Sequence, residues 1–80
     1  MRIPRDIDGD RLATLLSGFD YEITRQAGSH IRLTTSRNGE HHLTIPRHRP
    51  LRVGTLNAIV GDVAAHLGVT KEQVLKELFF

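Results

Sequence analysis

The chain contains no cysteine and no long hydrophobic run. Without cysteine it has no disulfide framework, no thiol nucleophile and no thiolate ligand for a metal ion. No apolar stretch approaches the ~20 residues of a membrane span, and the N-terminal residues lack the apolar core of a signal peptide. We therefore expect a protein of the reducing cytoplasm that does not bind a membrane.

The chain is also short, with 80 residues. A chain of this length buries only about 60% of its unfolded surface, so its core is thin. It has no room for a cofactor-binding domain beside a substrate domain. We expect a single domain over residues 1–80 and no small-molecule cofactor.

Acidic residues are scarce in the middle of the chain. Residues 21–54 include six arginines and only two glutamates, so this segment has a charge of +4. Because the net charge of the chain is +2, the remaining residues together carry −2. The same segment holds four of the five histidines: His30, His41, His42 and His48. Because the guanidinium group holds phosphate oxygens in pairs, this segregation favours an RNA or DNA partner.

Hydrophobic spacing predicts a helix near the N-terminus. Its apolar residues recur at the helical interval, and they are Leu12, Leu15, Leu16 and Phe19. Asp8 and Asp10 stand near its start, where carboxylates can cap free amides, and we expect Gly18 to end it.

Three strands are predicted next, over residues 21–26, 30–36 and 41–45. Alternation in the second strand places Ile31, Leu33 and Thr35 on one face and His30, Arg32 and Thr34 on the other. The third strand alternates in the same way, with Leu43 and Ile45 opposite His42 and Thr44. Asn38-Gly39 between these strands is a strong hairpin signal, and Pro46 closes the third strand.

Two helices complete the chain. The first has apolar residues at helical spacing, namely Leu56, Ile59, Val60, Val63, Ala64 and Leu67, and Gly68 is expected to end it. The second begins at Thr70, with Gln73 completing a capping box. The pattern therefore predicts an α+β fold, in which helices cover the apolar face of an antiparallel sheet and leave the other face polar.

Gly28, Ser29 and His30 form the most informative motif, a tight turn that opens into the second strand. His30 shares a strand face with Arg32, so a titratable imidazole lies beside a fixed positive charge. This combination suits a phosphodiester, whose cleavage needs a proton shuttle and an anion clamp. The alternative is a solvent-exposed strand histidine with no chemical role.

An ordered set of short motifs resembles the HicA family of toxins. These motifs are Gly18-Phe19, Gly28-Ser29-His30, Thr44-Ile45-Pro46-Arg47-His48, and Gly54-Thr55-Leu56 with Ile59. The resemblance extends from about Leu12 to about Leu78. Members of this family are small mRNA interferases of toxin–antitoxin pairs, with a fold like that of the double-stranded RNA-binding domain, so the resemblance implies an α-β-β-β-α domain with an additional C-terminal helix.

The resemblance also implies a function. It implies an endoribonuclease that cuts mRNA and arrests translation, and a HicB-like antitoxin that occludes the active histidine. The catalytic histidine of the family corresponds to His30, and a less constant one corresponds to His48. Gly28, Ser29 and Arg32 are expected to support His30. The predicted RNA-binding residues are Arg25, Arg32, Arg37, Arg47, Arg49 and Arg52.

Two features depart from the family pattern. The loop after the third strand is rich in lysine in many members, whereas here it carries Arg47, Arg49 and Arg52. The last helix continues to Phe79-Phe80, past the point where many members end. We interpret this tail either as part of the core or as a contact surface for the antitoxin.

Other chemistries are weaker interpretations of the same residues. His41 and His42 are adjacent on a strand and therefore point to opposite faces, so they do not readily share a metal ion, and we predict no metal site. Ser29 is adjacent to His30, and neighbouring residues rarely form a nucleophile–base pair, so we expect its hydroxyl to stabilise the turn.

Two non-catalytic functions remain as alternatives. Residues 60–78 resemble a DNA-binding helix-turn-helix, but the would-be recognition helix balances Lys71 and Lys76 with Glu72 and Glu77. A passive RNA-binding module of the same fold is the other alternative. It would retain RNA intact, whereas an interferase would shorten it.

Overall fold

The computed structural model describes residues 3–80. Its elements are α1 (Gly9–Leu15), the 3₁₀ helix η1 (Leu16–Phe19), β1 (Glu22–Ala27), β2 (His30–Thr35), β3 (His41–Pro46), α2 (Val53–Leu67) and α3 (Lys71–Phe79). The predicted α+β order of helix, three strands and two helices is confirmed, with strand limits within one residue of those predicted. Of the helices in residues 3–80, none is long and apolar enough to cross a membrane.

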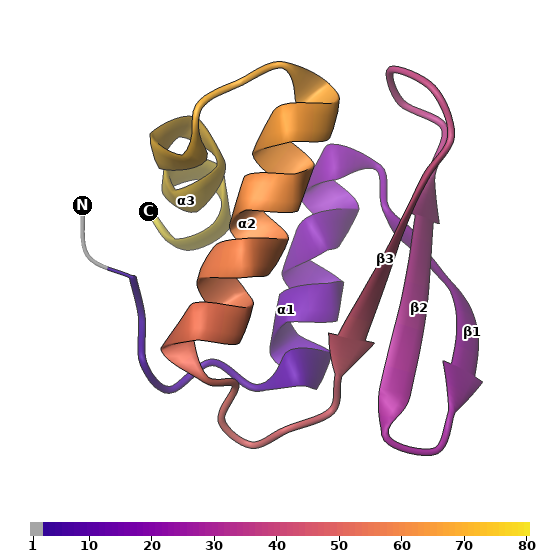
Figure 1. Ribbon diagram of the computed structural model, residues 1–80, viewed down its shortest axis with the longest axis vertical. Helices are drawn as coiled ribbons and strands as arrows, with labels where there is room; N and C mark the ends of the chain where they lie inside the picture. Colours follow the sequence, from indigo (N-terminus) through magenta and orange to yellow (C-terminus); the bar gives the residue numbers. More distant parts are fainter. Residues whose placement is uncertain (1–2) are drawn as a thin grey trace.

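The three strands form one antiparallel sheet in the order β1-β2-β3. The helices stand on one side of this sheet, and β1 lies on the far side of β2 from them (Figure 1). The predicted alternation is confirmed, because Ile31, Leu33 and Thr35 are buried while His30 and Arg32 are exposed. No helix of residues 3–80 covers the other face, and we call it the open face.

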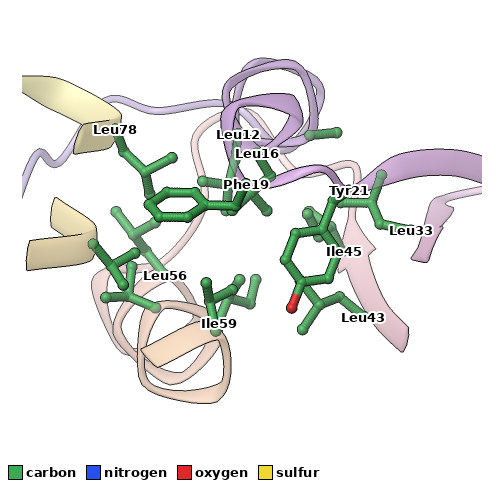
Figure 2. Packing of buried hydrophobic residues seen from close by; sticks show 14 of the residues in the cluster. Leu12, Leu16, Phe19, Tyr21, Leu33, Leu43, Ile45, Leu56, Ile59 and Leu78 are labelled. Atoms are coloured by element: carbon green, nitrogen blue, oxygen red, sulfur yellow. The ribbon is translucent and has the colours of Figure 1, made fainter. Parts of the chain in front are cut away.

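The core lies between the sheet and the helices. Figure 2 shows side chains of α1, η1 and the strands meeting those of the two C-terminal helices. Its buried members include Leu12, Leu16, Phe19, Tyr21, Leu33, Leu43, Ile45, Leu56, Ile59 and Leu78. The two residues of the C-terminal tail differ in burial. Phe79 packs against this core, whereas Phe80 is 73% exposed.

The turns follow the predicted chemistry. Gly28 has φ +59° between β1 and β2, and the Asn38-Gly39 hairpin has φ values of 57° and 97°. Gly68 has φ 70° at the end of α2. The Thr70–Gln73 capping box is present at the start of α3, where the Gln73 amide donates to the Thr70 hydroxyl over 3.1 Å.

The prediction for the end of the first helix was wrong. The α-helix ends at Leu15 and continues as a 3₁₀ turn through Gly18, and the residue in the left-handed region is Asp20, with φ 65°. The tighter turn buries Phe19 and returns the chain so that the Tyr21 amide donates to the Leu16 carbonyl over 3.3 Å. Asp8 is the N-cap residue of α1, but in the described structure its side chain makes no capping hydrogen bond. Only its backbone carbonyl takes part, by accepting from the Leu12 amide.

Gly9 marks a close approach between α1 and the end of β3. Its amide donates to the His48 carbonyl over 3.1 Å, and a Cβ added to it would lie 2.1 Å from the Pro46 carbonyl oxygen. Two residues before Gly9, the Ile7 carbonyl accepts a hydrogen bond from the Leu51 amide over 2.8 Å. Only glycine therefore allows α1 to begin against this strand.

The β2–β3 hairpin is fastened to the C-terminal end of α2. His66 Nε2 donates to the carbonyls of Arg37 and Gly39, over 2.8 and 3.0 Å, and the Asn38 side chain donates to the His66 carbonyl over 2.8 Å. The His66 ring also stacks on His41 with 4.3 Å between centroids. His41 Nδ1 in turn lies 2.9 Å from the hydroxyl of buried Tyr21.

Replacement of Gly9 by alanine is expected to lower the free energy of unfolding by about 2 kcal/mol or more, because the new methyl group meets a backbone carbonyl that cannot rotate away. Urea unfolding followed by circular dichroism measures the loss. Gly54→Ala is the matched control, since a Cβ there meets no atom within 4 Å and alanine has a higher helix propensity than glycine. Equal midpoints for both variants would contradict the close approach.

Alkaline pH is expected to destabilise the protein through Tyr21. Burial, and secondarily the charge of Asp62, raises the pKa of Tyr21 from 10.0 to about 12. Because the folded protein holds this proton more tightly, the stabilisation is complete below pH 10 and is lost as the pH rises towards 12. The slope is about 1.4 kcal/mol per pH unit in that window. Tyr21→Phe should remove this slope in urea titrations, and a slope that persists in the variant would assign it to other groups.

Candidate nucleic-acid interface

His30 is the first residue of β2 and lies exposed on the open face. It pairs with Ala27 of β1 on one side and with Pro46 of β3 on the other. A histidine enclosed by the apolar core could not reach an RNA backbone, and this ring is outside the core. The position therefore meets the first requirement for the predicted role.

The Gly28-Ser29 turn sets the environment of the His30 ring. The Ser29 carbonyl accepts from the Arg47 amide over 2.7 Å, which fixes the turn to the end of β3. The Ser29 hydroxyl lies 3.2 Å from His30 Nδ1, so it contacts the ring as well as belonging to the turn. This contact occupies Nδ1 and leaves Nε2 as the nitrogen available to a ligand.

Two arginines lie side by side on the open face, one step along the sheet from His30. Arg25 of β1 pairs directly with Arg32 of β2. A bulge between Ile23 and Arg25 creates this pairing, because an unbroken register after Ile23 would place Thr24 opposite Arg32 and turn Arg25 to the face of the helices. The prediction named both arginines, but sequence alone gives no sign of the bulge that brings them together.

The six predicted RNA-binding arginines fall into two groups. Within residues 3–80, no carboxylate lies at ion-pair distance from Arg25, Arg32 or Arg52. The other three are paired with aspartates: Arg37 with Asp20, and Arg47 and Arg49 with Asp10. Like charges in directly opposed strand positions destabilise a sheet. The unneutralised Arg25–Arg32 pair is thus a cost to folding that an anionic ligand would relieve.

Arg47 lies next to the His30 end of the sheet but is held by α1. Its Nε and Nη2 atoms donate to the two carboxylate oxygens of Asp10, over 3.0 and 3.3 Å.

Arg37 is at the β2–β3 hairpin, at the opposite end of β2 from His30. It lines a hollow of about 390 Å³ together with Phe19, Asn38, Leu67, Val69, Gln73 and Glu77. The structure therefore does not bring Arg37 to His30.

The remaining histidines have separate surroundings. The His48 ring is exposed in the loop after β3, two residues beyond the partner of His30. His41 and His42 point to opposite faces, as predicted: His41 contacts Tyr21 and His66, and His42 lies on the open face.

A line of hydrogen-bonding groups crosses the open face at the end away from His30. Glu40 Oε2 lies 3.3 Å from His42 Nε2, and His42 Nδ1 lies 2.9 Å from the Thr34 hydroxyl. That hydroxyl lies 2.9 Å from the hydroxyl of Thr24. Strand alternation predicts that Thr34 and His42 share this face, but the line itself depends on the β2–β3 register and on the bulge in β1, which have no signal in the sequence.

The described structure is thus a small α+β domain whose uncovered sheet face carries an exposed histidine beside two unneutralised arginines. A sequence profile of the family described as HicA toxin of bacterial toxin–antitoxin matches residues 9–69, about three quarters of the chain. The chain belongs to the HicA toxin family, as the resemblance predicted, and is accordingly a toxin with a cognate antitoxin. Comparisons with curated proteins and with solved structures gave no match.

Removal of one charge from the arginine pair is expected to stabilise the fold. Arg25→Gln should raise the free energy of unfolding by about 0.2–1 kcal/mol, because it removes repulsion between directly opposed cations. The gain should shrink in high salt, which screens exposed charges. Urea unfolding in dilute and concentrated NaCl measures both effects, with Arg5→Gln, outside the sheet, as the control. A destabilised Arg25→Gln variant would show that the pair does not repel.

Proposed function

We propose that this toxin is an endoribonuclease that cleaves mRNA at the open face, with His30 as its catalytic residue. The observation that carries the proposal is the exposed His30 ring next to the Arg25–Arg32 pair, which has no carboxylate partner in the described residues. Membership in the HicA toxin family supports the same activity.

Cleavage of RNA requires three events at one phosphate. The 2′-hydroxyl loses its proton, its oxygen bonds to phosphorus in line with the leaving group, and the 5′-oxygen departs with a proton. His30 Nε2 takes the first proton, since Nδ1 faces Ser29. Imidazole suits this role because both of its protonation states are accessible near neutral pH. A positioned general base contributes about 10²–10⁴ in rate.

Arg32 neutralises the charge that develops on the phosphoryl oxygens. It lies two residues from His30 on the same strand face, whereas Arg47 is bound to Asp10. Gly28 and Ser29 position the ring. His48 is the proposed donor of the proton to the 5′-oxygen, because it lies two residues beyond the strand partner of His30.

Membership in the HicA toxin family supports a proposal for the biological setting. We propose that residues 1–80 form one cytoplasmic domain, that cleavage of mRNA arrests translation during stress, and that a HicB-like antitoxin covers His30. Arg25, Arg49 and Arg52 extend the RNA-binding surface, with Arg37 at its far end. We propose that the reaction uses no metal ion and no small-molecule cofactor.

Two other functions fit fewer of the observations. A helix-turn-helix would use α3 to contact DNA, but three of its nine residues are buried and its Lys71 donates to Asn57 over 3.2 Å. A passive RNA binder would use the same arginines and could stack a base on His30, but it would need no proton acceptor there. Both alternatives predict that RNA survives incubation with the protein intact.

His30→Ala and His30→Gln are each expected to lower the rate of RNA cleavage by about 10²-fold or more, because both remove the general base. Purified protein is incubated with mRNA in the presence of EDTA, and the products are separated on a denaturing gel. Glu72→Gln, on the exposed surface of α3, is the control and should cleave like the unaltered protein. Undiminished cleavage by both His30 variants would refute the assignment.

A further inference from the structure

The open face is divided into three rows of residues that run across the strands. The first row contains His30, and the second contains the Arg25–Arg32 pair. The third contains Glu22, Thr34 and His42 in register, with Glu40 bonded to His42. Successive rows are about 6.8 Å apart, since they are separated by two residues of an antiparallel strand.

The three rows have different chemistry. The second row carries two positive charges, Arg25 and Arg32, beside the uncharged Thr44 of β3, and it suits a phosphate. The third row carries two carboxylates, Glu22 and Glu40, which repel phosphate, so it suits an uncharged part of a nucleotide. Because this row lies about 13.6 Å from His30 along β2, a single strand that follows β2 would reach it about two nucleotides from the cleaved bond.

His42 has little hydrogen-bonding capacity left for a ligand. A carboxylate only accepts, so His42 Nε2–H donates to Glu40, and Nδ1 faces the Thr34 hydroxyl. The ring is therefore held in one orientation, and its side chain remains 40% exposed. What it offers is an aromatic face, on which RNA-binding proteins stack bases. The Glu40 side chain beside it is 75% exposed and can accept from an amino group.

We propose that the third row is a base-binding subsite, in which a base stacks on His42 and donates its amino group to Glu40. The subsite selects adenine or cytosine over uracil, because uracil has no amino group. Thr34 is a positioning residue that fixes the ring, and the Arg25–Arg32 pair holds the intervening phosphate. This inference rests on the proposed function, because it takes the RNA cleaved at His30 as its ligand.

Binding of short RNA tests the subsite separately from cleavage. Fluorescently labelled hexamers of A, C and U are titrated with the His30→Gln protein, and anisotropy gives each Kd. We expect the A and C hexamers to bind at least about 5-fold more tightly than the U hexamer, the discrimination expected of one good base contact. Glu40→Ala in this background should abolish the preference.

Matched variants separate the subsite from general electrostatics. Glu72→Ala makes the same truncation and charge change on α3 and should retain the preference. His42→Ala should weaken binding of the A hexamer by at least about 5-fold, and His42→Phe should restore it, because stacking needs only an aromatic face. Arg32→Gln should weaken all three hexamers alike, since a phosphate contact is independent of sequence.

The results distinguish failure of the subsite from failure of the nuclease. Identical behaviour of Glu40→Ala and Glu72→Ala, or unchanged binding of the A hexamer by His42→Ala, would overturn the subsite while leaving the nuclease intact. Selective binding by a protein whose unaltered form cleaves no RNA would uphold the subsite and overturn the nuclease. Absence of binding to every hexamer would overturn both.

Discussion

The hydrogen bond from the Arg47 amide to the Ser29 carbonyl joins the two segments that the proposed chemistry needs. On one side is the turn that presents His30, and on the other is the loop that carries Arg47, Arg49 and His48. The same loop accepts the Gly9 amide at His48, which brings α1 and Asp10 to this end of the sheet. Much of the arrangement of the chain around His30 is therefore imposed by backbone contacts.

The open face shows how a thin core and a charged surface coexist in 80 residues. The apolar side chains of β2 and β3 face the helices, so the polar face adds little to the packing that holds the domain together. Charges can then be placed on it for a ligand at a modest expense in stability. The Arg25–Arg32 pair is the clearest instance, because its neighbours on the sheet leave it without a counterion among the described residues.

Much of this fold could be predicted because its signals are local. Alternation around Ile31 and Leu33 identified the buried face, and Asn38-Gly39 identified the hairpin, since each depends only on neighbouring residues. The close approach of Gly9 to Pro46 joins positions far apart in the sequence and has no local signature. The same is true of the His66 contacts with the hairpin.

The site was predictable to the same degree. The motif around His30 and the face shared with Arg32 follow from the sequence, together with a resemblance that the family match confirmed. The partner of Arg32 across the sheet does not follow from the sequence. One additional residue in β1 decides whether Arg25 or Thr24 lies opposite Arg32. The first-helix prediction failed for a related reason: burial of Phe19 and Tyr21 on either side of a tight turn outweighed the preference for ending at Gly18.

Hydrogen bonds to neighbouring elements hold both ends of β2 in place. The strand is tied to β3 at Ser29, and the hairpin that follows it is tied to α2 through His66. Between these points its outward side chains project from a strand whose two ends are held by hydrogen bonds. A ligand on the open face would therefore meet side chains at the fixed intervals of an extended strand.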